Sequence, residues 1–547
     1  MSKRDSMGYD VVIVGAGVAG LSAAIRLKQL AHEEGRETSI VVLEKGETVG
    51  AHILSGALIS TFALDQLLPD WRTQGAPLDT RVSQSRLSYL SEKKSWSLPE
   101  KLLPPLMRHR KSDAYVGSLG ALVRWLGQQA EALGVEIYPG FAATELLYDQ
   151  QGALKGVATA EQGGEQGLEL HGRYTLLAEG ARGFLSQELM EKFDLRAGCE
   201  PQKYALGLKE LWQIRAEAHQ AGRVEHYFGW PLTGRLNRGR ANGGAFLYHY
   251  GDRLVSLGLV VHADYENPAL SPFDLLQHFK THPAISPLLA GGVRLGYGAR
   301  AITAGGWQSL PRLVFPGGAL LGCAAGMVNA ASMKGTHNAI VSGCAAALSC
   351  HEALCEERSG DELVGYQERV EQGEIARDLK AARFIKPLLT RYGMRRGGAL
   401  GGAALWLEQG VKRSLPFSLS HVQRDRDSLK KQALQRGARL VPDDVLTFDK
   451  ASSLHLAGVS HEEDQPSHLV FREAGRALDN RHDLGLEPAQ YYCPAGVFEL
   501  RQSPAGQDFI HLSSSNCLHC KMCDLKDSGV NIRWTPPPKG GPNYVNM

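Results

Sequence analysis

The 547-residue sequence lacks an excess of charge of either sign. Its 60 Lys and Arg residues nearly balance 58 Asp and Glu residues, which leaves a formal net charge of +2. Nucleic-acid-binding domains carry a basic surface, so this composition argues against nucleic acid as a partner. With 43% hydrophobic residues, the chain is long enough for two or three domains around a sizeable core.

Long apolar runs are also missing. A membrane-spanning helix needs about 18 or more consecutive apolar residues, and none is present, so we expect no spanning helix. The N-terminus, MSKRDSMGYDVVIVGAG, enters an apolar strand almost at once and leaves no room for a signal peptide or an Arg-rich transit peptide. We therefore expect a cytosolic protein or a mature chain, with shallow membrane association still open.

Cysteine is scarce for a chain of this length. The nine cysteines are an odd number, and a disulfide framework is unexpected in a reducing compartment. Five of them stand singly in apolar or helical surroundings, where we expect buried, inert thiols: Cys199, Cys323, Cys344, Cys350 and Cys355. The other four lie close to the C-terminus, where a metal site or a catalytic site is the better explanation.

Three of these four follow one another at three-residue steps in NCLHCKMCDLKD, as Cys517, Cys520 and Cys523. The C-x2-C-x2-C spacing wraps three thiolates around a cubane, and Cys493, followed by proline as in bacterial ferredoxins, supplies the fourth ligand. We predict a 4Fe-4S cluster. The alternative is a structural zinc site, which commonly uses paired C-x2-C knuckles and would here include His519 as a ligand; we expect His519 to face solvent.

The N-terminal segment predicts a dinucleotide-binding βαβ unit. Its expected elements are a strand over 10–14, a helix over 19–30 and a second strand that ends at Glu44. Gly15 permits the tight turn, Gly17 lets the backbone approach a pyrophosphate, and Gly20 allows close packing of helix and strand. Glu44 stands where it accepts hydrogen bonds from a ribose.

Two later stretches favour FAD over NAD. TLLAEGARG, 175–183, reads as a strand that enters a turn at Gly180, and the segment 313–348 reads as a strand, a turn with Gly322 and Gly326, and a helix that begins near Asn329. Such stretches resemble flavoproteins of the glutathione-reductase and hydroxylase-like group. Many of these carry Asp after the glycine, where this chain has Cys323, a doubtful ligand and more simply a small residue packed at the turn. We find no second GxGxxG after a strand and expect no separate NAD(P)H domain.

The middle of the chain suggests contacts with apolar partners. Residues 382–417 interleave apolar stretches and Trp406 with cations, which suits an interfacial segment on anionic lipid or a solvated basic surface over a packing helix. The cations are Arg383, Lys386, Arg391, Arg395, Arg396, Lys412 and Arg413. Residues 51–68 are expected in the core. Gly243 and Gly244 precede an apolar strand of an expected hairpin, where glycines expose the backbone to a ligand or simply form part of the turn.

Taken together, these features resemble the electron-transfer-flavoprotein:ubiquinone oxidoreductase family over almost the whole chain. The motifs that carry the resemblance are VGAHILSGA, ALGLKELW, GGAFLYH, LGLVVHADYENPALSPF, YGARAITAGGWQSLPRLVFPGG, MKGTHNAI, HEEDQPSHL, YCPAGVFE and NCLHCKMCDLKD. The resemblance implies an enzyme, an electron-transferring-flavoprotein dehydrogenase. It would take single electrons from reduced electron transfer flavoprotein and pass pairs through FAD to ubiquinone, linking fatty-acid and amino-acid oxidation to the respiratory chain.

The same resemblance implies an α/β fold, α+β overall. Its expected parts are a Rossmann-like FAD domain (1–80, about 110–200 and 300–380), a quinone-binding β-sheet domain (about 81–110 and 201–299), a membrane-facing segment (about 381–440) and a ferredoxin-like cluster domain (about 441–547). Family quinone contacts fall on Gly243 and Gly244. A monotopic position is implied, on the cytoplasmic face of a bacterial inner membrane or the matrix face in mitochondria.

The chain departs from the family pattern beside the cluster. Phe498 and Met522 stand where relatives often carry Tyr and Thr, and losing two hydroxyl donors predicts a lower reduction potential. No residue identifies itself as the proton donor for quinone reduction, since His249 is equally well explained as a strand histidine. The rival functions are a flavin-dependent hydroxylase or reductase with a structural metal knuckle, a redox-sensing or cluster-bearing assembly protein, and a related nitrogen-fixation oxidoreductase.

Overall fold

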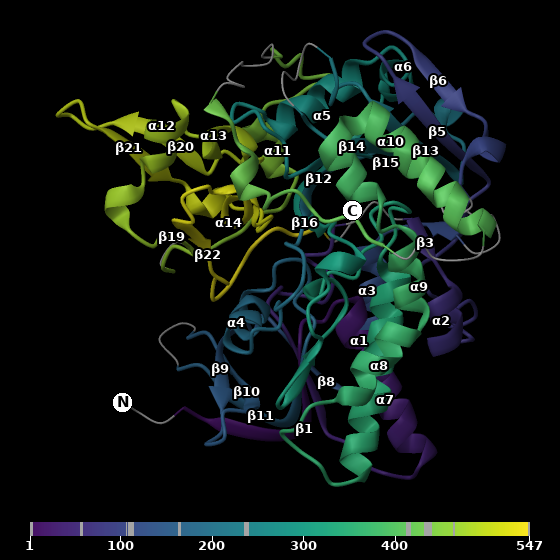
Figure 1. The fold of residues 1–547 in the computed structure, drawn as a ribbon, viewed down its shortest axis with the longest axis vertical. Coiled ribbons are helices and arrows are strands. Elements are labelled where there is room, and N and C mark those ends of the chain that lie inside the picture. The colour runs from purple at the N-terminus through teal and green to yellow at the C-terminus, as the bar shows by residue number, and fades with distance from the viewer. Residues whose placement is uncertain are drawn as a thin grey trace.

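A computed structural model describes residues 4–54, 58–104, 107, 114–161, 166–234, 240–411, 417–431, 440–462, 465–544 and 547. Figure 1 shows three lobes: one around the strands β1, β8 and β11 in the lower half, one around β12 to β16 at the upper right, and a C-terminal lobe at the upper left. The chain ends near the centre, between the lobes (Figure 1).

The lower lobe is built on a mostly parallel sheet. Its strands follow the order β17 (Val314–Phe315), β18 (Gly318–Leu320), β11 (Glu169–Leu177), β1 (Ser6–Val14), β2 (Ile40–Glu44) and β8 (Glu136–Pro139), with β10 (Leu154–Thr159) and β9 (Ala143–Tyr148) joined to β11. Strands β18, β11, β1, β2 and β8 run parallel. Their carboxyl ends therefore meet at one edge, where ligands of such sheets bind.

Helices cover this sheet. Helix α1 (Val18–Glu33) packs along α7 (Thr336–Cys355) and against α3 (Leu119–Ala132). The predicted βαβ unit is confirmed, with β1 starting at Ser6 and α1 running to Glu33. The remaining elements of this lobe are β3 (Leu58–Ser60), α2 (Phe62–Leu67), β4 (Thr80–Arg81), β7 (Ala114–Val116), α4 (Phe184–Lys192), α8 (Val364–Gln372) and α9 (Glu374–Ala381).

The helix predicted to begin near Asn329 begins at Thr336. The Oδ1 atom of Asn329 accepts hydrogen bonds from the backbone N–H groups of Ala331 and Ser332, at 3.1 Å each. Asn side chains offer the backbone such an alternative to helical hydrogen bonding. This local turn delays the helix by seven residues.

The second sheet has the order β16 (Val293–Thr303), β12 (Tyr204–Gln213), β15 (Leu254–His262), β14 (Gly243–Tyr250), β13 (Arg223–Gly229), β5 (Gln84–Leu90) and β6 (Ser95–Leu98). The predicted hairpin is confirmed as β14 and β15. On one face, Leu206, Leu208 and Leu257 pack against α5 (Pro272–Thr281), which is followed by α6 (Ser286–Leu289). Because side chains alternate along a strand, residues such as Gly207, Lys209 and Val260 lie on the opposite face.

The C-terminal lobe consists of short elements. They are α11 (Lys450–His455), β19 (Leu469–Phe471), α12 (Asp479–Leu484), α13 (Ala489–Tyr492), β20 (Phe498–Gln502), β21 (Asp508–Leu512), α14 (Met522–Lys526) and β22 (Ile532–Trp534). One hydrophobic core joins Tyr492, Leu518 and Trp534 of this lobe to the second sheet. The Tyr297 hydroxyl of β16 also donates to the carbonyl of Pro494 at 3.1 Å. The lobe is therefore docked on the sheet.

Helix α10 (Ile385–Val411) lies beside the second sheet and is kinked at Gly393, whose φ is +70° (Figure 1). Such a positive φ is readily adopted only by glycine. Within the described residues, no helix combines the length and the apolar character needed to cross a bilayer.

A fully buried ion pair ties α5 to the second sheet. The Lys280 ammonium donates to both carboxylate oxygens of Glu210, at 2.9 Å each, and Arg294 lies 3.4 Å from the same carboxylate. Removing one partner of a buried pair leaves an uncompensated charge.

We expect Lys280→Met to lower the free energy of unfolding by about 3 kcal/mol, measured by denaturant titration. Lys155→Met, at an exposed position of β10, is the control and should change it by less than about 0.5 kcal/mol.

Candidate functional site

A cavity of about 400 Å³ lies where the three lobes meet. Its wall includes Gly17 after β1, Glu44 at the end of β2, Phe246 of β14, Val260 of β15 and Trp534 of β22. The predicted nucleotide-binding residues and the second sheet therefore border one shared space.

The glycines after β1 form a cradle at the nucleotide end. Gly15 has a φ of +107°, and a Cβ there would lie 2.6 Å from the carbonyl oxygen of Ala178. A Cβ at Gly20 would lie 2.1 Å from the oxygen of Gly15, so only glycine allows this approach of helix and strand. A Cβ at Gly17 would meet nothing within 4 Å. The helix N-terminus is therefore open to an anionic group such as a pyrophosphate.

Glu44 and Gly180 border the same space. The Glu44 carboxylate accepts hydrogen bonds from the backbone N–H groups of Ala16, at 3.1 Å, and Gly46, at 2.8 Å. These contacts fix its orientation and leave lone pairs for a ribose. Gly180 makes its turn with a φ of +76°. This end of the cavity fits the adenosine diphosphate part of FAD.

The third predicted stretch reaches the cavity through its neighbours. Gly322, Gly326 and Asn329 themselves do not appear in the lining formed by the described residues, whereas Cys323 and Val328 do. Gly322 and Gly326 have positive φ, and the Asn329 amide donates to the Asp378 carboxylate at 2.8 Å. Cys323 is half-buried at the turn, and burial raises the pKa of its thiol to about 11.

The scattered cysteines are less buried than predicted. Only Cys350 of the five is buried, while Cys199, Cys323, Cys344 and Cys355 are intermediate. Loss of solvent nonetheless raises the pKa of all five thiols, for example that of Cys344 to about 12. Thiols rather than thiolates prevail, so these side chains are unreactive for that reason.

The four C-terminal cysteines converge on one small pocket. All four are buried and line it together, along with Phe498 and Met522. The backbone N–H groups of Val497 and His519 donate to the sulfurs of Cys493 and Cys517, at 3.4 Å each. Four buried thiols with backbone donors aimed at their sulfurs match the donor set of a 4Fe-4S cluster.

His519, predicted to face solvent, is buried with 1% of its surface exposed. Its Nδ1 lies 3.1 Å from the Lys45 ammonium, and its Nε2 lies 3.0 Å from Nε2 of His461. Lys45 is 474 residues away in sequence, so no local sequence pattern could predict the contact. His519 therefore connects the cysteine loop to the wall of the large cavity.

Lys521 borders both spaces. It lines the cysteine pocket and the large cavity, and its ammonium donates to the carbonyl of Arg182 at 2.7 Å. The sequence offered no specific signal for Lys521, although its position beside Cys520 made it a neighbour of the predicted cluster. Lys521 is thus the described residue that the walls of the cysteine pocket and the large cavity share.

The glycine pair lies at the start of β14. Gly244 pairs with Val260, which lines the cavity, although the lining formed by the described residues includes neither glycine. Gly243 has a φ of +147°, and a Cβ there would lie 1.9 Å from the oxygen of Val260. His249 projects to the opposite face of the sheet from Phe246, its ring accepts from the Gln220 N–H at 3.2 Å, and burial lowers its pKa to about 3. It is a strand histidine.

Two of the cations expected to face lipid are buried instead. Arg383 pairs with Glu408 at 2.6 Å, and Lys386 pairs with Asp264 at 2.8 Å and lies 3.0 Å from Nδ1 of His262. Burying an unpaired charge costs free energy. Each of these buried cations is therefore paired with a carboxylate on a different element. Lys412 and Arg413 lie outside the described residues.

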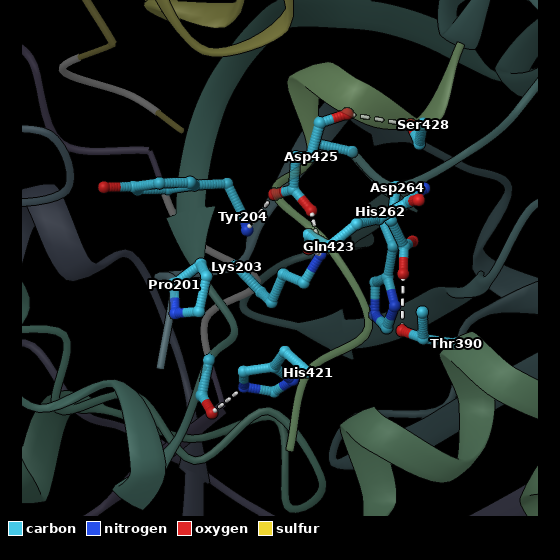
Figure 2. Close-up of polar contacts among 12 residues, drawn as sticks. Pro201, Lys203, Tyr204, His262, Asp264, Thr390, His421, Gln423, Asp425 and Ser428 are labelled. Carbon is cyan, nitrogen blue, oxygen red and sulfur yellow. Dashed lines mark hydrogen bonds and ion pairs between the residues drawn. The ribbon is translucent and has the colours of Figure 1, made fainter. Parts of the chain in front are cut away.

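Figure 2 shows a neighbouring buried network that joins the start of β12 to residues 421–428. The Lys203 ammonium pairs with Asp425 at 3.0 Å, and Asp425 accepts from the N–H of Tyr204 at 2.7 Å. His421 lies 2.9 Å from the carbonyl of Gly305. The network fixes the segment after α10 against the second sheet.

One face of α10 exposes apolar side chains. Leu400, Trp406 and Leu407 are 49%, 42% and 52% exposed, and the Trp406 indole donates to the carbonyl of Leu102, itself 67% exposed. We call these four residues the α10 patch. Arg395 and Arg396 on the same helix are exposed, so an apolar stripe lies beside cations, the composition of an interfacial helix.

Comparison with known proteins decides the family. Residues 204–302 match "ETF-QO, ubiquinone-binding", residues 444–545 match "Electron transfer flavoprotein-ubiquinone oxidoreductase, 4Fe-4S", and residues 13–71 match "NAD(P)-binding Rossmann-like domain". The electron transfer flavoprotein-ubiquinone oxidoreductase of Pseudomonas aeruginosa is 43% identical over all of both chains. The mitochondrial protein of Mus musculus is 43% identical over 98% of this chain and 89% of its own length.

The chain belongs to the electron transfer flavoprotein-ubiquinone oxidoreductase family. The expected fold class and the expected cofactors, FAD and a 4Fe-4S cluster, with ubiquinone as substrate, are confirmed. A geranylgeranyl bacteriochlorophyll reductase-like protein from Thermoplasma acidophilum shares the fold, with a TM-score of 0.54 at 18% identity over 76% of this chain and 94% of its own. The flavin-dependent brominase Bmp2 is similar, with a TM-score of 0.51 at 15% identity over 73% of this chain and 94% of its own.

The open cradle at Gly17 generates a prediction for this oxidoreductase. A Cβ at position 17 contacts no atom of the protein, so the chain can still fold, but a valine side chain there would fill the space above the helix N-terminus. We expect Gly17→Val to leave the fold intact and to reduce bound FAD more than tenfold, measured by flavin absorbance per protein. Gly8→Val is the matched control, because a Cβ at Gly8 in β1 also meets nothing within 4 Å. Equal flavin loss in both variants would contradict the assignment.

The pocket position of Phe498 gives a second prediction. A tyrosine hydroxyl there can donate to a cluster sulfur, and one hydrogen bond is worth about 1 kcal/mol. For a one-electron couple this corresponds to about 40 mV, so Phe498→Tyr should raise the cluster midpoint potential by roughly that amount in an EPR-monitored redox titration. Phe509→Tyr, at the exposed position of β21, should leave it unchanged. An unchanged or lower potential in Phe498→Tyr would refute the tuning role.

Proposed function

We propose that this protein accepts electrons one at a time from reduced electron transfer flavoprotein and delivers pairs of them to ubiquinone at a membrane surface. The single observation that carries the proposal is the position of Lys521, which borders both the four-cysteine pocket and the large cavity. The family findings supply quinone reduction as the reaction. The partner flavoprotein is inferred from family membership.

The residues have distinct tasks in this proposal. Cys493, Cys517, Cys520 and Cys523 hold the cluster, and Gly15, Gly17, Gly20, Glu44 and Gly180 hold the nucleotide. Gly322, Gly326 and Asn329 form the turn that brings Cys323 and Val328 to the cavity wall. When bound, the cluster supplies single-electron transfer and FAD stores one or two electrons. The chain removes the four cysteines from solvent, because all of them are buried.

Ubiquinone is placed at the apolar end of the cavity. Leu54, Leu58, Phe246 and Val260 line that end, and an apolar wall with few polar groups suits a quinone ring. We place the substrate beside the backbone of Gly243 and Gly244, where the sheet bears no side chain at Gly244 that would keep a ring away from it.

The domain ranges expected from the sequence complete the proposal. We assign FAD to 1–80, about 110–200 and 300–380, quinone to about 81–110 and 201–299, and the cluster to about 441–547. We assign membrane contact to the segment of about 381–440. Strands β1, β2, β11 and β18 support the FAD ranges, strands β5, β6 and β12 to β15 support the quinone ranges, and the four C-terminal cysteines support the cluster range.

The membrane position follows from the α10 patch. An apolar stripe flanked by arginines binds anionic bilayers at their surface, and ubiquinone is a lipid-soluble substrate. We propose peripheral, monotopic attachment on the cytoplasmic face of a bacterial inner membrane, or on the matrix face if the protein is mitochondrial. There the enzyme would link fatty-acid and amino-acid oxidation to the respiratory chain.

Cluster removal tests the electron route. Cys520→Ser removes one of four thiolate ligands, so we expect the holoprotein to lose its cluster EPR signal and at least about 90% of its ubiquinone reduction with reduced electron transfer flavoprotein, while FAD is retained. Cys355→Ser, at an isolated cysteine near the end of α7, should match the parent protein. Bound zinc without iron, together with NAD(P)H-driven flavin reduction, would favour a hydroxylase with a metal knuckle instead.

Vesicle binding tests the membrane face. Trp406→Glu and Leu407→Glu place charge in the α10 patch and should weaken flotation with anionic phospholipid vesicles severalfold, because buried apolar area drives interfacial binding. Phe509→Glu changes a side chain of similar exposure, 42%, on β21 of the C-terminal lobe. If Phe509→Glu lowers flotation as much as the α10 variants do, the patch is not the attachment site.

A further inference from the structure

Lys209 projects from the middle of β12 onto the cavity face of the second sheet. It lines the cavity, and its neighbours on the adjacent strands are both glycines, Gly258 of β15 and Gly298 of β16. The ring of Phe246 lies over Gly258, since a Cβ there would come within 2.3 Å of it, and Tyr544 lies over Gly298 in the same way at 2.6 Å. The lysine stem therefore stands between two aromatic rings.

The Lys209 ammonium is buried and unpartnered. Only 2% of the residue is exposed, and its Nζ atom has no hydrogen-bond partner among the described residues. Other buried lysines have acceptors: Lys203 reaches Asp425, Lys280 reaches Glu210, and Lys386 reaches Asp264. Lys521 and Lys526 donate to backbone carbonyl oxygens. Burying a polar group without a partner costs free energy. The cavity must therefore supply an acceptor for Lys209 when it is filled.

No side chain of the described part of the wall supplies that acceptor. The titratable or charged groups on the surrounding elements are Tyr248 of β14, His262 of β15, Arg300 of β16 and Tyr544 near the C-terminus. Further along the same wall lie Lys45, His52, Cys323, Lys334 and Lys521. The carboxylates at the nucleotide end, Glu44 and Glu179, accept from backbone N–H groups instead. Burial alone lowers the pKa of Lys209 to about 7. Its ammonium thus gives up a proton near neutral pH.

We propose that Lys209 is the general acid that protonates one carbonyl oxygen of the quinone. The inference rests on the proposed function and names a residue for it. As the established reaction delivers an electron pair to the quinone, an N–H bond of the Lys209 ammonium breaks and an O–H bond forms on the quinone. The amine is left neutral and regains a proton from water after the quinol leaves. This accounts for one of the two protons that quinol formation consumes.

His262 is the other wall residue with a comparable position, and its contacts differ. Its Nδ1 lies 3.0 Å from the Lys386 ammonium, which also pairs with Asp264, and burial and this neighbour lower the pKa of His262 to about 3. It is therefore neutral at working pH. Lys209, in contrast, is a buried cation of the cavity wall with no hydrogen-bond partner among the described residues.

The experiment compares Lys209→Met and Lys209→Arg with the parent holoenzyme in detergent. The methionine side chain is one atom shorter than that of lysine and the arginine side chain one atom longer, and neither titrates near neutral pH. Ubiquinone-1 is the probe, and electrons come from reduced electron transfer flavoprotein. A general acid acts only when protonated, so parent kcat/KM should fall as pH rises above about 7. In Lys209→Met, kcat/KM should no longer fall above about pH 7, and at pH 6.5 it should be about 100-fold below the parent value. In Lys209→Arg the fall above about pH 7 should also be absent. Lys155→Met, on the exposed side of β10, should retain the parent profile.

A proton-free acceptor separates chemistry from structure. Ferricyanide takes single electrons without protons, so its reduction by Lys209→Met should stay within twofold of the parent value, with unchanged flavin and EPR spectra. Rescue of quinone reduction by added ethylammonium would further support the role. If kcat/KM of Lys209→Met still falls as pH rises above about 7, or if the variant loses quinone reduction and ferricyanide reduction together, Lys209 is not the acid. If the parent holoenzyme itself fails to reduce ubiquinone-1, the proposed function falls and this assignment with it.

Discussion

The docking of the cysteine loop on the flavin-side turn is the contact on which the rest of the structure depends. The Lys521 ammonium donates to the Arg182 carbonyl at 2.7 Å, and the Arg182 guanidinium donates to Asp524 at 2.6 Å. These reciprocal contacts join a turn after β11 to the start of α14. Electron transfer requires the two cofactors to be near each other. This junction holds the cysteine loop beside the turn after β11 and so keeps the two sites close.

Burial of charge runs through the molecule and has two different outcomes. Most buried cations, such as Lys280 and Lys386, are neutralised by carboxylates on other elements and hold lobes or helices together. Such pairs contribute little net stability but are costly to break. Lys209 is buried without this compensation. A charge that the fold leaves unpaired in a cavity is better explained by a substrate than by structure, since an unpaired buried charge is otherwise a pure cost.

Local patterns predicted the βαβ unit and singled out the four cysteines that line one pocket. The glycines after β1, the acid at the end of β2 and the C-x2-C-x2-C spacing each depend on residues close in sequence, and backbone geometry within such short segments is largely local. The misplaced start of α7 is instructive, because Asn329 forms a turn in which its side chain replaces helical hydrogen bonds. Residue types that favour a helix did not reveal this competition.

The sequence by itself determined the family and the cofactors and singled out four cysteines as cluster ligands, because each depends on short motifs of specific residues. Tertiary structure alone decided that His519 is buried against Lys45, that Arg383 and Lys386 are paired rather than exposed to lipid, and that Lys209 faces a cavity without an acceptor. The physical reason is the same in each case. The free energy of a charged or polar side chain depends on the partners around it, and those partners come from segments up to several hundred residues away.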